Sequence, residues 1–155
     1  MKFIDLFLNP QAWALSGAVV AFLVSALGSA KGCGIAGQAA AGVVAEEPSR
    51  FGSTMILQAL ASTQAIYGFV IAFMIIGKIS ADLTLEQGIS LFVAGLPAGI
   101  VGYVSAVFQG KVATAGIHLV AKRPEAVGSG IIYALTVELF AILALVVSIL
   151  MVAKI

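Results

Sequence analysis

Long apolar stretches alternate with short polar segments along almost the whole chain. The apolar stretches cover about residues 12–44, 52–77, 87–121 and 126–153. The polar segments between them are EEPSR (46–50), KISADLTLE (78–86) and KRPE (122–125). A helix needs about 20 residues to cross the hydrocarbon core of a bilayer, which is about 30 Å thick. Each stretch meets this length, so the pattern predicts an all-α membrane protein with four transmembrane helices.

The first and third stretches are longer than a membrane crossing requires. A helix over residues 12–44 would be about 50 Å long at about 1.5 Å per residue. We therefore expect both long helices to project beyond the lipid on the side of the EEPSR and KRPE segments. Pro48 and Pro124 stand where a helix should stop and turn. The chain is thus predicted to form two helical hairpins, over residues 1–80 and 81–155.

The two predicted hairpins are also related in sequence. When Pro48 is aligned with Pro124, Ser62 falls opposite Glu138 in the second helices of the two hairpins. The pattern indicates a duplicated hairpin that has diverged, in which only the second half carries a carboxylate. We therefore expect one acidic group in the membrane for every four helices.

The first helices of the two hairpins align less simply. Lys31 can be placed on Lys111 after a gap of about one helical turn. This alignment sets Gln109 of the second half opposite Ser29 of the first. It predicts that one extra turn separates the two repeats in these arms.

Small residues recur every four positions on the first and third helices. They are Gly17, Ala21, Ser25, Ser29, Cys33, Gly37 and Ala41 on the first, and Ala94, Ala98, Gly102, Ala106 and Gly110 on the third. Such stripes let helix backbones approach closely and drive helix association in lipid. One interpretation is tight packing within a single chain. We favour packing between copies, in a closed homo-oligomeric ring with these helices inside and the bulkier second and fourth helices outside.

Composition supports a membrane protein and excludes several functions. Of the 155 residues, 61% are hydrophobic and 10% are charged, against about 25% charged residues in soluble domains. The net charge of +1 provides no basic surface for nucleic acid. Cys33 is the single cysteine, so the chain has no internal disulfide. No phosphate-binding loop motif occurs, so any ATP hydrolysis must take place on another chain.

Glu138 is the one charged residue within the fourth apolar stretch. An acidic side chain at the centre of a bilayer costs at least about 2.5–3.5 kcal/mol, so it marks a functional site by default. Thr63, Gln64 and Gln109 lie at the same expected depth, roughly 18 Å from the side of the EEPSR and KRPE segments. Tyr67 follows Thr63 by four residues and therefore shares its helix face.

This polar layer fits an ion-binding site. A hard monovalent cation needs several oxygen donors to replace its water shell, whereas a proton needs only the carboxylate and one hydrogen-bond partner. Hydrogen bonding between helices would also explain each amide or hydroxyl separately. The shared depth with Glu138 favours a cation site.

Three segments carry a resemblance to a known family. ILQALASTQAIYGFVIAF (56–73), FQGKVATAGI (108–117) and TVELFAILALVVSIL (136–150) resemble the proteolipid subunits of V-type rotary ATPases, above all the bacterial Na⁺-translocating form, called the K or c subunit. The likeness includes GSAKGCGIAG (28–37) and covers nearly the whole chain. In that family, the TQxxYG stretch and the glutamine of the third span distinguish Na⁺ carriers from proton carriers.

The resemblance implies roles for individual residues. Na⁺ would be bound by Glu138, by the side-chain oxygens of Thr63, Gln64 and Gln109, and by the main-chain carbonyl of Leu60, while Tyr67 would hydrogen-bond Glu138 as a latch. Relatives carry Pro-Gly or similar residues after this leucine, whereas this chain has Ala61-Ser62. Here the neighbouring Thr63 or Gln64 is expected to perturb the helix and free the carbonyl.

The resemblance also implies a rotor that works with other subunits. Identical subunits would form the ring within the lipid, and Na⁺ would be the transported ion, with no organic cofactor. An arginine of a stator subunit, called a or I, would displace the ion from Glu138. ATP hydrolysis on separate catalytic subunits would turn the ring through a central-stalk subunit.

The distribution of basic residues gives an orientation in the cell membrane. Arg50, Lys122 and Arg123, with Lys31 and Lys111, lie toward the loops, whereas Lys2, Lys78 and Lys154 lie toward the other side. The positive-inside rule then places loops 45–51 and 122–125 in the cytoplasm and both termini outside. We expect Lys31 and Lys111 to contact lipid head groups.

Three other interpretations fit parts of the sequence. A proton-carrying ring subunit of the same ATPase class is the nearest. A small multidrug/proton exchanger also has four helices and one membrane glutamate, but it acts as a dimer and needs an aromatic-lined cavity. A purely structural proteolipid leaves the shared depth of the polar residues unexplained.

Overall fold

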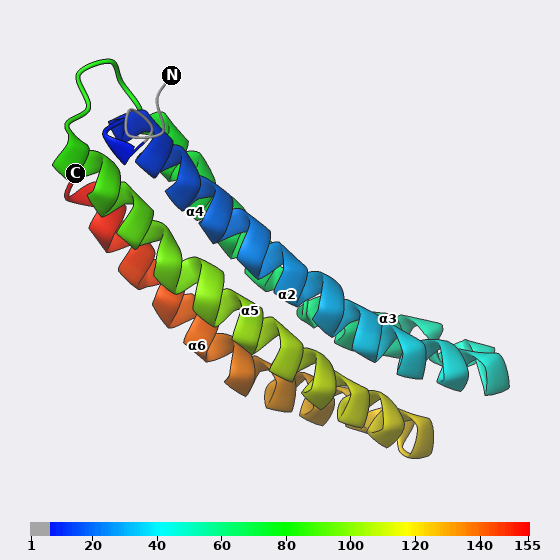
Figure 1. The fold of residues 1–155 in the computed structure, drawn as a ribbon. Helices are drawn as coiled ribbons and strands as arrows, with labels where there is room; N and C mark the ends of the chain where they lie inside the picture. Colours follow the sequence, from blue (N-terminus) through cyan, green and yellow to red (C-terminus); the bar gives the residue numbers. More distant parts are fainter. Residues whose placement is uncertain (1–6) are drawn as a thin grey trace.

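The computed structural model describes residues 7–155 as a long, curved bundle of helices (Figure 1). Its elements are α2 (Pro10–Glu46), the 3₁₀ turn η1 (Pro48–Arg50), α3 (Phe51–Leu60), α4 (Thr63–Gly77), α5 (Leu85–Lys122), the 3₁₀ turn η2 (Pro124–Ala126) and α6 (Val127–Ala153). Within this described part, four helical spans are long and apolar enough to cross a membrane, and no residue is in a strand. The predicted all-α membrane fold is confirmed. Lys2, which entered the orientation count, lies outside the described residues.

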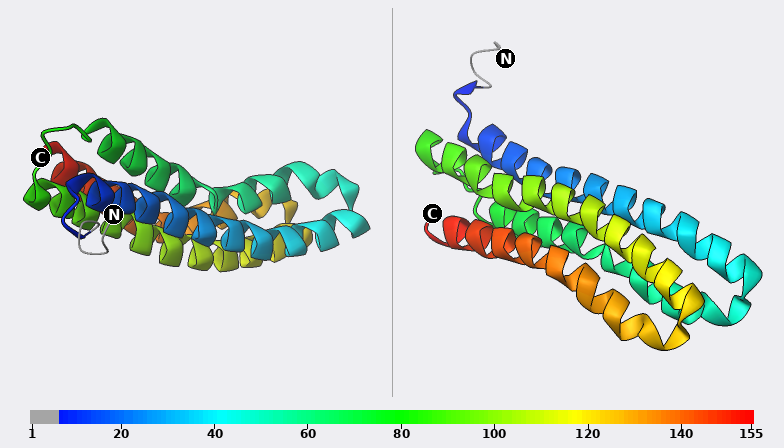
Figure 2. Two further views of the ribbon diagram at one scale, coloured as in Figure 1. Left: turned by 45° about the horizontal axis from the view of Figure 1, so that its top comes forward. Right: turned by 90° about the horizontal axis from the view of Figure 1, so that it is seen from below.

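The helices form two hairpins that lie side by side. α2 pairs with α3 and α4, and α5 pairs with α6, as the views in Figures 1 and 2 show. The turns η1 and η2 lie at one end of the bundle. The beginning of α2, the end of α6 and the connection between α4 and α5 lie at the other end. Both hairpin loops therefore face the same side of the membrane.

Local sequence determines where the long helices begin. The Asn9 side chain accepts a hydrogen bond from the Ala12 N–H at 3.1 Å, and Pro10 occupies the first position of α2. Thr84 and Gln87 form a capping box at the start of α5. These caps satisfy main-chain donors that would otherwise be exposed at the helix ends.

A single shift of 76 positions relates the two hairpins. Glu47 and Arg123, which end α2 and α5, share φ −138° and ψ 88°, and their numbers, 47 and 123, differ by 76. The same shift relates two hydrogen bonds: Cys33 Sγ donates to the carbonyl of Gln58 at 3.6 Å, and Gln109 Nε2 donates to the carbonyl of Ala134 at 3.3 Å. Gln109 is therefore equivalent to Cys33.

The expected pairing of Gln109 with Ser29 through a one-turn gap is wrong. Neither α2 nor α5 carries an inserted turn relative to the other. The shift of 76 positions that relates their ends, Glu47 and Arg123, also relates Cys33 to Gln109 in their middles. Ser29 is instead the counterpart of Ser105.

The small-residue stripes pack against each other inside one chain. A Cβ atom added to Gly17 of α2 would lie 2.6 Å from the Cα of Phe92 on α5, and one added to Gly32 would overlap the Ala106 carbonyl. On α5 every residue of the predicted stripe is buried within this chain. Our expectation that the stripes serve mainly contacts between copies is wrong, because α2 and α5 run beside each other and use both stripes.

We expect the substitution Gly32→Ala to destabilise the protein, because its Cβ has no room between α2 and α5. Overpacking of this kind costs about 1–3 kcal/mol. Gly42→Ala on the same helix is the matched control, since a Cβ there meets nothing within 4 Å. Thermal unfolding of the detergent-solubilised protein should show a lower midpoint for Gly32→Ala alone. Equal midpoints for the two variants would contradict the backbone contact.

Candidate ion-binding site

The second arm of the first hairpin is interrupted between α3 and α4. α3 ends at Leu60 and α4 begins at Thr63. Across the gap, the Ala65 N–H donates to the carbonyl of Ser62 at 3.2 Å and to the hydroxyl of Ser29 on α2 at 3.0 Å. The hydroxyl of Thr63 donates to the Leu60 carbonyl at 3.0 Å. The helix is thus distorted at this point although no Pro-Gly pair is present.

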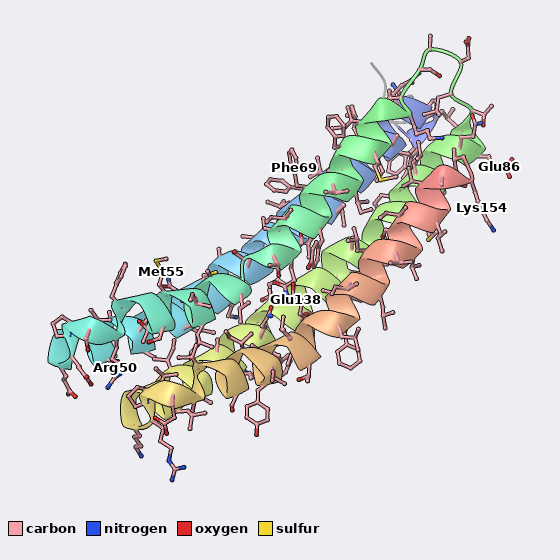
Figure 3. The ribbon with its side chains drawn as sticks, turned by 180° about the vertical axis from the view of Figure 1, so that it is seen from behind. Arg50, Met55, Phe69, Glu86, Glu138 and Lys154 are labelled. Atoms are coloured by element: carbon pink, nitrogen blue, oxygen red, sulfur yellow. The ribbon has the colours of Figure 1, made fainter. Side chains whose placement is uncertain are left out.

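A chain of hydrogen bonds joins the two hairpins at the same level. Tyr67 Oη donates to Glu138 Oε1 at 2.6 Å, and Gln109 Nε2 donates to Glu138 Oε2 at 3.2 Å. Gln64 Nε2 donates in turn to Gln109 Oε1 at 2.5 Å. Glu138 lies about halfway along the bundle, where the hairpins meet (Figure 3). Helices α4, α5 and α6 therefore meet at a single carboxylate.

The network is closed off from its surroundings. Gln64 and Gln109 are 0% exposed and Glu138 is 4% exposed. Tyr67 is only partly buried. Because burial removes water, each polar atom here needs a partner from the protein or from a bound ion.

One buried atom of the network has no hydrogen-bond partner. It is the side-chain oxygen Oε1 of Gln64. Leaving such an acceptor unsatisfied costs about 1–3 kcal/mol. In residues 7–155 the only other buried side-chain atom without a partner is Nε of Arg50, far away at the loop end. An orphaned oxygen, in a network that ends on a carboxylate, is a ready ligand for a cation.

The other predicted ligands also keep unused lone pairs. The main-chain carbonyl oxygen of Leu60 and the side-chain oxygen Oε1 of Gln109 each accept one hydrogen bond in this structure and can accept a second. The Thr63 hydroxyl donates its hydrogen bond to the Leu60 carbonyl, so its oxygen can still act as an acceptor or a metal ligand. Leu60, at the end of α3, and Thr63, at the start of α4, form this pair directly before Gln64.

Ser105 is a member of the network that the sequence analysis missed. Its hydroxyl lies 3.4 Å from Gln64 Nε2 and donates to the carbonyl of Val137 at 3.0 Å. It is 4% exposed and stands one turn before Gln109 on the same face of α5. That i, i+4 spacing was the available signal. Ser29 was noted only in the stripe of small residues and in the repeat alignment, yet it accepts a hydrogen bond from the backbone at the helix break.

Comparison with known proteins gives a consistent family. The family model of the ATP synthase C subunit matches residues 16–75 and again residues 92–151, and the starts of these matches are separated by the same 76 positions. V-type sodium ATPase subunit K of Enterococcus hirae is 45% identical over 142 residues, which cover 92% of this chain and 91% of that protein.

Two further relatives are more distant. A-type ATP synthase subunit K of Methanocaldococcus jannaschii is 38% identical over 143 residues, covering 92% of this chain and 63% of that protein. The 16 kDa proteolipid of the human V-type proton ATPase is 28% identical over 142 residues, covering 92% of each.

Proposed function

This chain belongs to the family of the ATP synthase C subunit, and we propose that it is the Na⁺-carrying subunit in the membrane rotor ring of a V-type ATPase. Proteins of this family form the ion-translocating rings of rotary ATPases, and ATP is hydrolysed on other subunits. Membership of the family excludes the multidrug exchanger considered above. The name of the Enterococcus hirae relative, a sodium ATPase subunit, supports Na⁺ as the ion.

The observation that carries this proposal is the unpartnered Oε1 of Gln64, which is 0% exposed and belongs to the hydrogen-bonded network of Glu138. A bound Na⁺ would satisfy that oxygen and cancel the charge of the carboxylate. The proposed ligands are Glu138, Gln64, Thr63, Gln109 and the main-chain carbonyl of Leu60, with Tyr67 donating to Glu138.

A proton-carrying ring is the alternative, and a proton ATPase proteolipid is among the relatives. A proton on Glu138 would need only one hydrogen-bond partner. It would leave the buried Gln64 oxygen without any partner. The unpartnered side-chain oxygen of Gln64 therefore favours Na⁺ over a proton.

Neutralisation explains how the site would cross lipid. An ionised Glu138 at the bilayer centre costs at least about 2.5–3.5 kcal/mol, whereas a Na⁺-loaded site carries no net charge. Each site must therefore be loaded before it rotates into the lipid. Tyr67, which is less buried than the glutamines, would have to release Glu138 when the ion enters or leaves.

The remaining partners follow from this cycle. A stator subunit, a or I, would present an arginine to Glu138 and displace the ion into an exit path. A central-stalk subunit would hold the ring by loops 45–51 and 122–125 on the cytoplasmic side, with the termini outside. Moving one charge against the membrane potential takes about 2.3 kcal/mol per 100 mV, which ATP hydrolysis on other subunits must supply.

Two structural features support this arrangement in the membrane. Both loops lie at the same end of the bundle (Figure 2). Lys31 and Lys111 are exposed, as contact with lipid head groups requires.

We also divide the chain into two hairpins, residues 1–80 and residues 81–155, with the boundary between α4 and α5.

Replacing Glu138 with Gln should abolish coupled transport, because the variant has no charge for Na⁺ to neutralise. We expect ATP-driven ²²Na⁺ uptake by the reconstituted complex to fall at least 100-fold. Ser62→Ala, at the equivalent position of the first hairpin, is the matched control and should retain uptake. Transport at the wild-type rate in Glu138→Gln would rule out the assignment of this carboxylate.

Gln64→Ala should weaken Na⁺ binding to purified rings about 10- to 100-fold, since loss of one oxygen ligand corresponds to about 1.4–3 kcal/mol. The measurement is the Na⁺ concentration that protects Glu138 from carbodiimide labelling at constant pH. Gln58→Ala is the control, because Gln58 lies on α3 of the same arm and its side chain lies against Gly37 instead of the network. Labelling that does not respond to Na⁺ in the wild-type ring would favour the proton carrier.

A further inference from the structure

The amide of Gln109 has a fixed direction because a main-chain carbonyl faces its nitrogen. Gln109 Nε2 lies 3.3 Å from the carbonyl oxygen of Ala134 and 3.2 Å from Glu138 Oε2. A main-chain carbonyl can only accept a hydrogen bond, so the nitrogen of this amide, and not its oxygen, must face α6. The oxygen Oε1 of Gln109 is thereby turned toward Gln64, and it accepts a hydrogen bond from Gln64 Nε2.

The hydroxyl of Ser105 has a fixed direction for the same reason. Its Oγ lies 3.0 Å from the carbonyl oxygen of Val137, which can only accept, so the single hydroxyl hydrogen points to α6. The lone pairs of Oγ remain for Gln64 Nε2, at 3.4 Å. Two acceptors on α5, Gln109 Oε1 and Ser105 Oγ, therefore face the two hydrogens of the Gln64 amide.

These two acceptors decide which end of the Gln64 amide is left for an ion. Both hydrogens on Nε2 are directed to α5, and the oxygen Oε1 is the buried atom without a partner. In the reversed orientation, Oε1 would lie against the Gln109 oxygen with no hydrogen between them. The network thus offers a cation an oxygen, whereas a reversed amide would offer it an N–H group.

The hydrogen bond from Ser105 is not needed to hold α6 together. Val137 lies within the continuous helix α6 (Val127–Ala153), where each main-chain carbonyl bonds to the N–H four residues later. Ser29, which holds the position of Ser105 in the first hairpin, instead accepts from a main-chain N–H at the break between α3 and α4. Ser105 is 4% exposed and faces Gln64 of the other hairpin. Its surroundings therefore indicate a role at the ion site.

Entry of Na⁺ would leave Ser105 as the main acceptor for the Gln64 amide. The proposed site uses Gln109 Oε1 as a ligand, and that oxygen now accepts a hydrogen bond from Gln64 Nε2. A cation on this oxygen draws on the same lone pairs and repels the positively polarised hydrogens of Nε2. Ser105 Oγ is not among the proposed ligands, so it stays available to Gln64 in the loaded site.

We propose that Ser105 is a positioning residue for the transported Na⁺: it holds the Gln64 amide by its nitrogen and so keeps the amide oxygen directed to the ion. This inference rests on the proposed function of the chain as a Na⁺ carrier. Ser105 acts through Gln64 and does not touch the ion, because its hydrogen faces Val137 and its lone pairs face Gln64. A proton on Glu138 needs no oxygen from Gln64, so Ser105 favours Na⁺ over a proton.

Ser105→Ala should weaken Na⁺ binding to purified rings about 3- to 10-fold, the range expected for the loss of one neutral hydrogen bond. The measurement is the Na⁺ concentration that protects Glu138 from carbodiimide labelling at constant pH. The labelling rate in Na⁺-free buffer should be unchanged, because Ser105 bonds to Gln64 and Val137 and not to Glu138.

Ser25→Ala is the matched control for the loss of a buried hydroxyl. Ser25 is 0% exposed, and its hydroxyl donates to the Ala21 and Phe22 carbonyls of its own helix. Its loss should leave Na⁺ protection of Glu138 unchanged in rings of the same native mass. A rise in the protecting Na⁺ concentration equal to that of Ser105→Ala would overturn the specific role of Ser105.

A second background tests whether Ser105 acts through Gln64. Once Gln64 is replaced by Ala, the amide that Ser105 holds is gone, so adding Ser105→Ala should change the protecting Na⁺ concentration by less than about twofold. A purely structural role would weaken binding by the same factor in both backgrounds, because independent effects add as free energies. Equal factors in the two backgrounds would therefore overturn the proposal.

Ser105→Cys provides the test if the alanine variant does not assemble. Its side chain is similar in size to serine, but sulfur is a weak acceptor, so Na⁺ protection should again weaken. Intact rings of either variant with wild-type Na⁺ protection would overturn the role of Ser105 while leaving Na⁺ as the ion. Wild-type rings whose labelling does not respond to Na⁺ would instead contradict the proposed function itself.

Discussion

A carboxylate in the middle of a membrane must have its charge cancelled and its oxygen atoms satisfied, and this requirement determines the rest of the structure. Tyr67 from α4 and Gln109 from α5 meet the second need, because each donates a hydrogen bond to one oxygen of Glu138. These partners belong to different hairpins, so the site exists only while the hairpins keep a fixed register. Displacement by even one helical turn, about 5.4 Å, would separate the groups.

The contact between α2 and α5 provides that fixed register. At Gly17 and Gly32 the two backbones touch, with no room for a side chain between them. Such a contact resists sliding, because a shift of one turn would bring Trp13 or Ala21 to the place of Gly17. In lipid, where apolar surfaces gain little from association, close backbone packing is a main source of helix affinity. α2 and α5 thus position α4 and α6, which carry Tyr67 and Glu138.

The sequence predicted which large polar side chains meet at Glu138, because helix geometry converts residue number into depth. Glu138, Gln64 and Gln109 are large polar residues in apolar stretches, and each stands out by its burial cost. Ser105 and Ser29 could not be distinguished in this way, because a serine can satisfy its hydroxyl within its own helix, as Ser25 does with the Ala21 carbonyl.

The partners of helix faces were harder to predict than the faces themselves. The small-residue stripes were located correctly, but a stripe does not state which helix covers it. The similarity of Lys31 and Lys111 suggested an inserted turn between the repeats. The structure decides against it, because Cys33 and Gln109 make equivalent hydrogen bonds to the opposite arm. A main-chain carbonyl can accept a hydrogen bond from a thiol or from an amide. The residue types alone therefore do not reveal that Cys33 and Gln109 are equivalent.

The loss of the carboxylate from the first hairpin has an energetic consequence for the proposed rotor. If every hairpin boundary carried an ion, a ring with the same number of helices would move twice as many ions in each turn. For a fixed free energy of ATP hydrolysis per turn, halving that number doubles the free energy available to each ion. The ring could then pump against a steeper gradient. This advantage requires that the first hairpin carries no ion of its own, and Ser62, at the position equivalent to Glu138, has no charge with which to hold one.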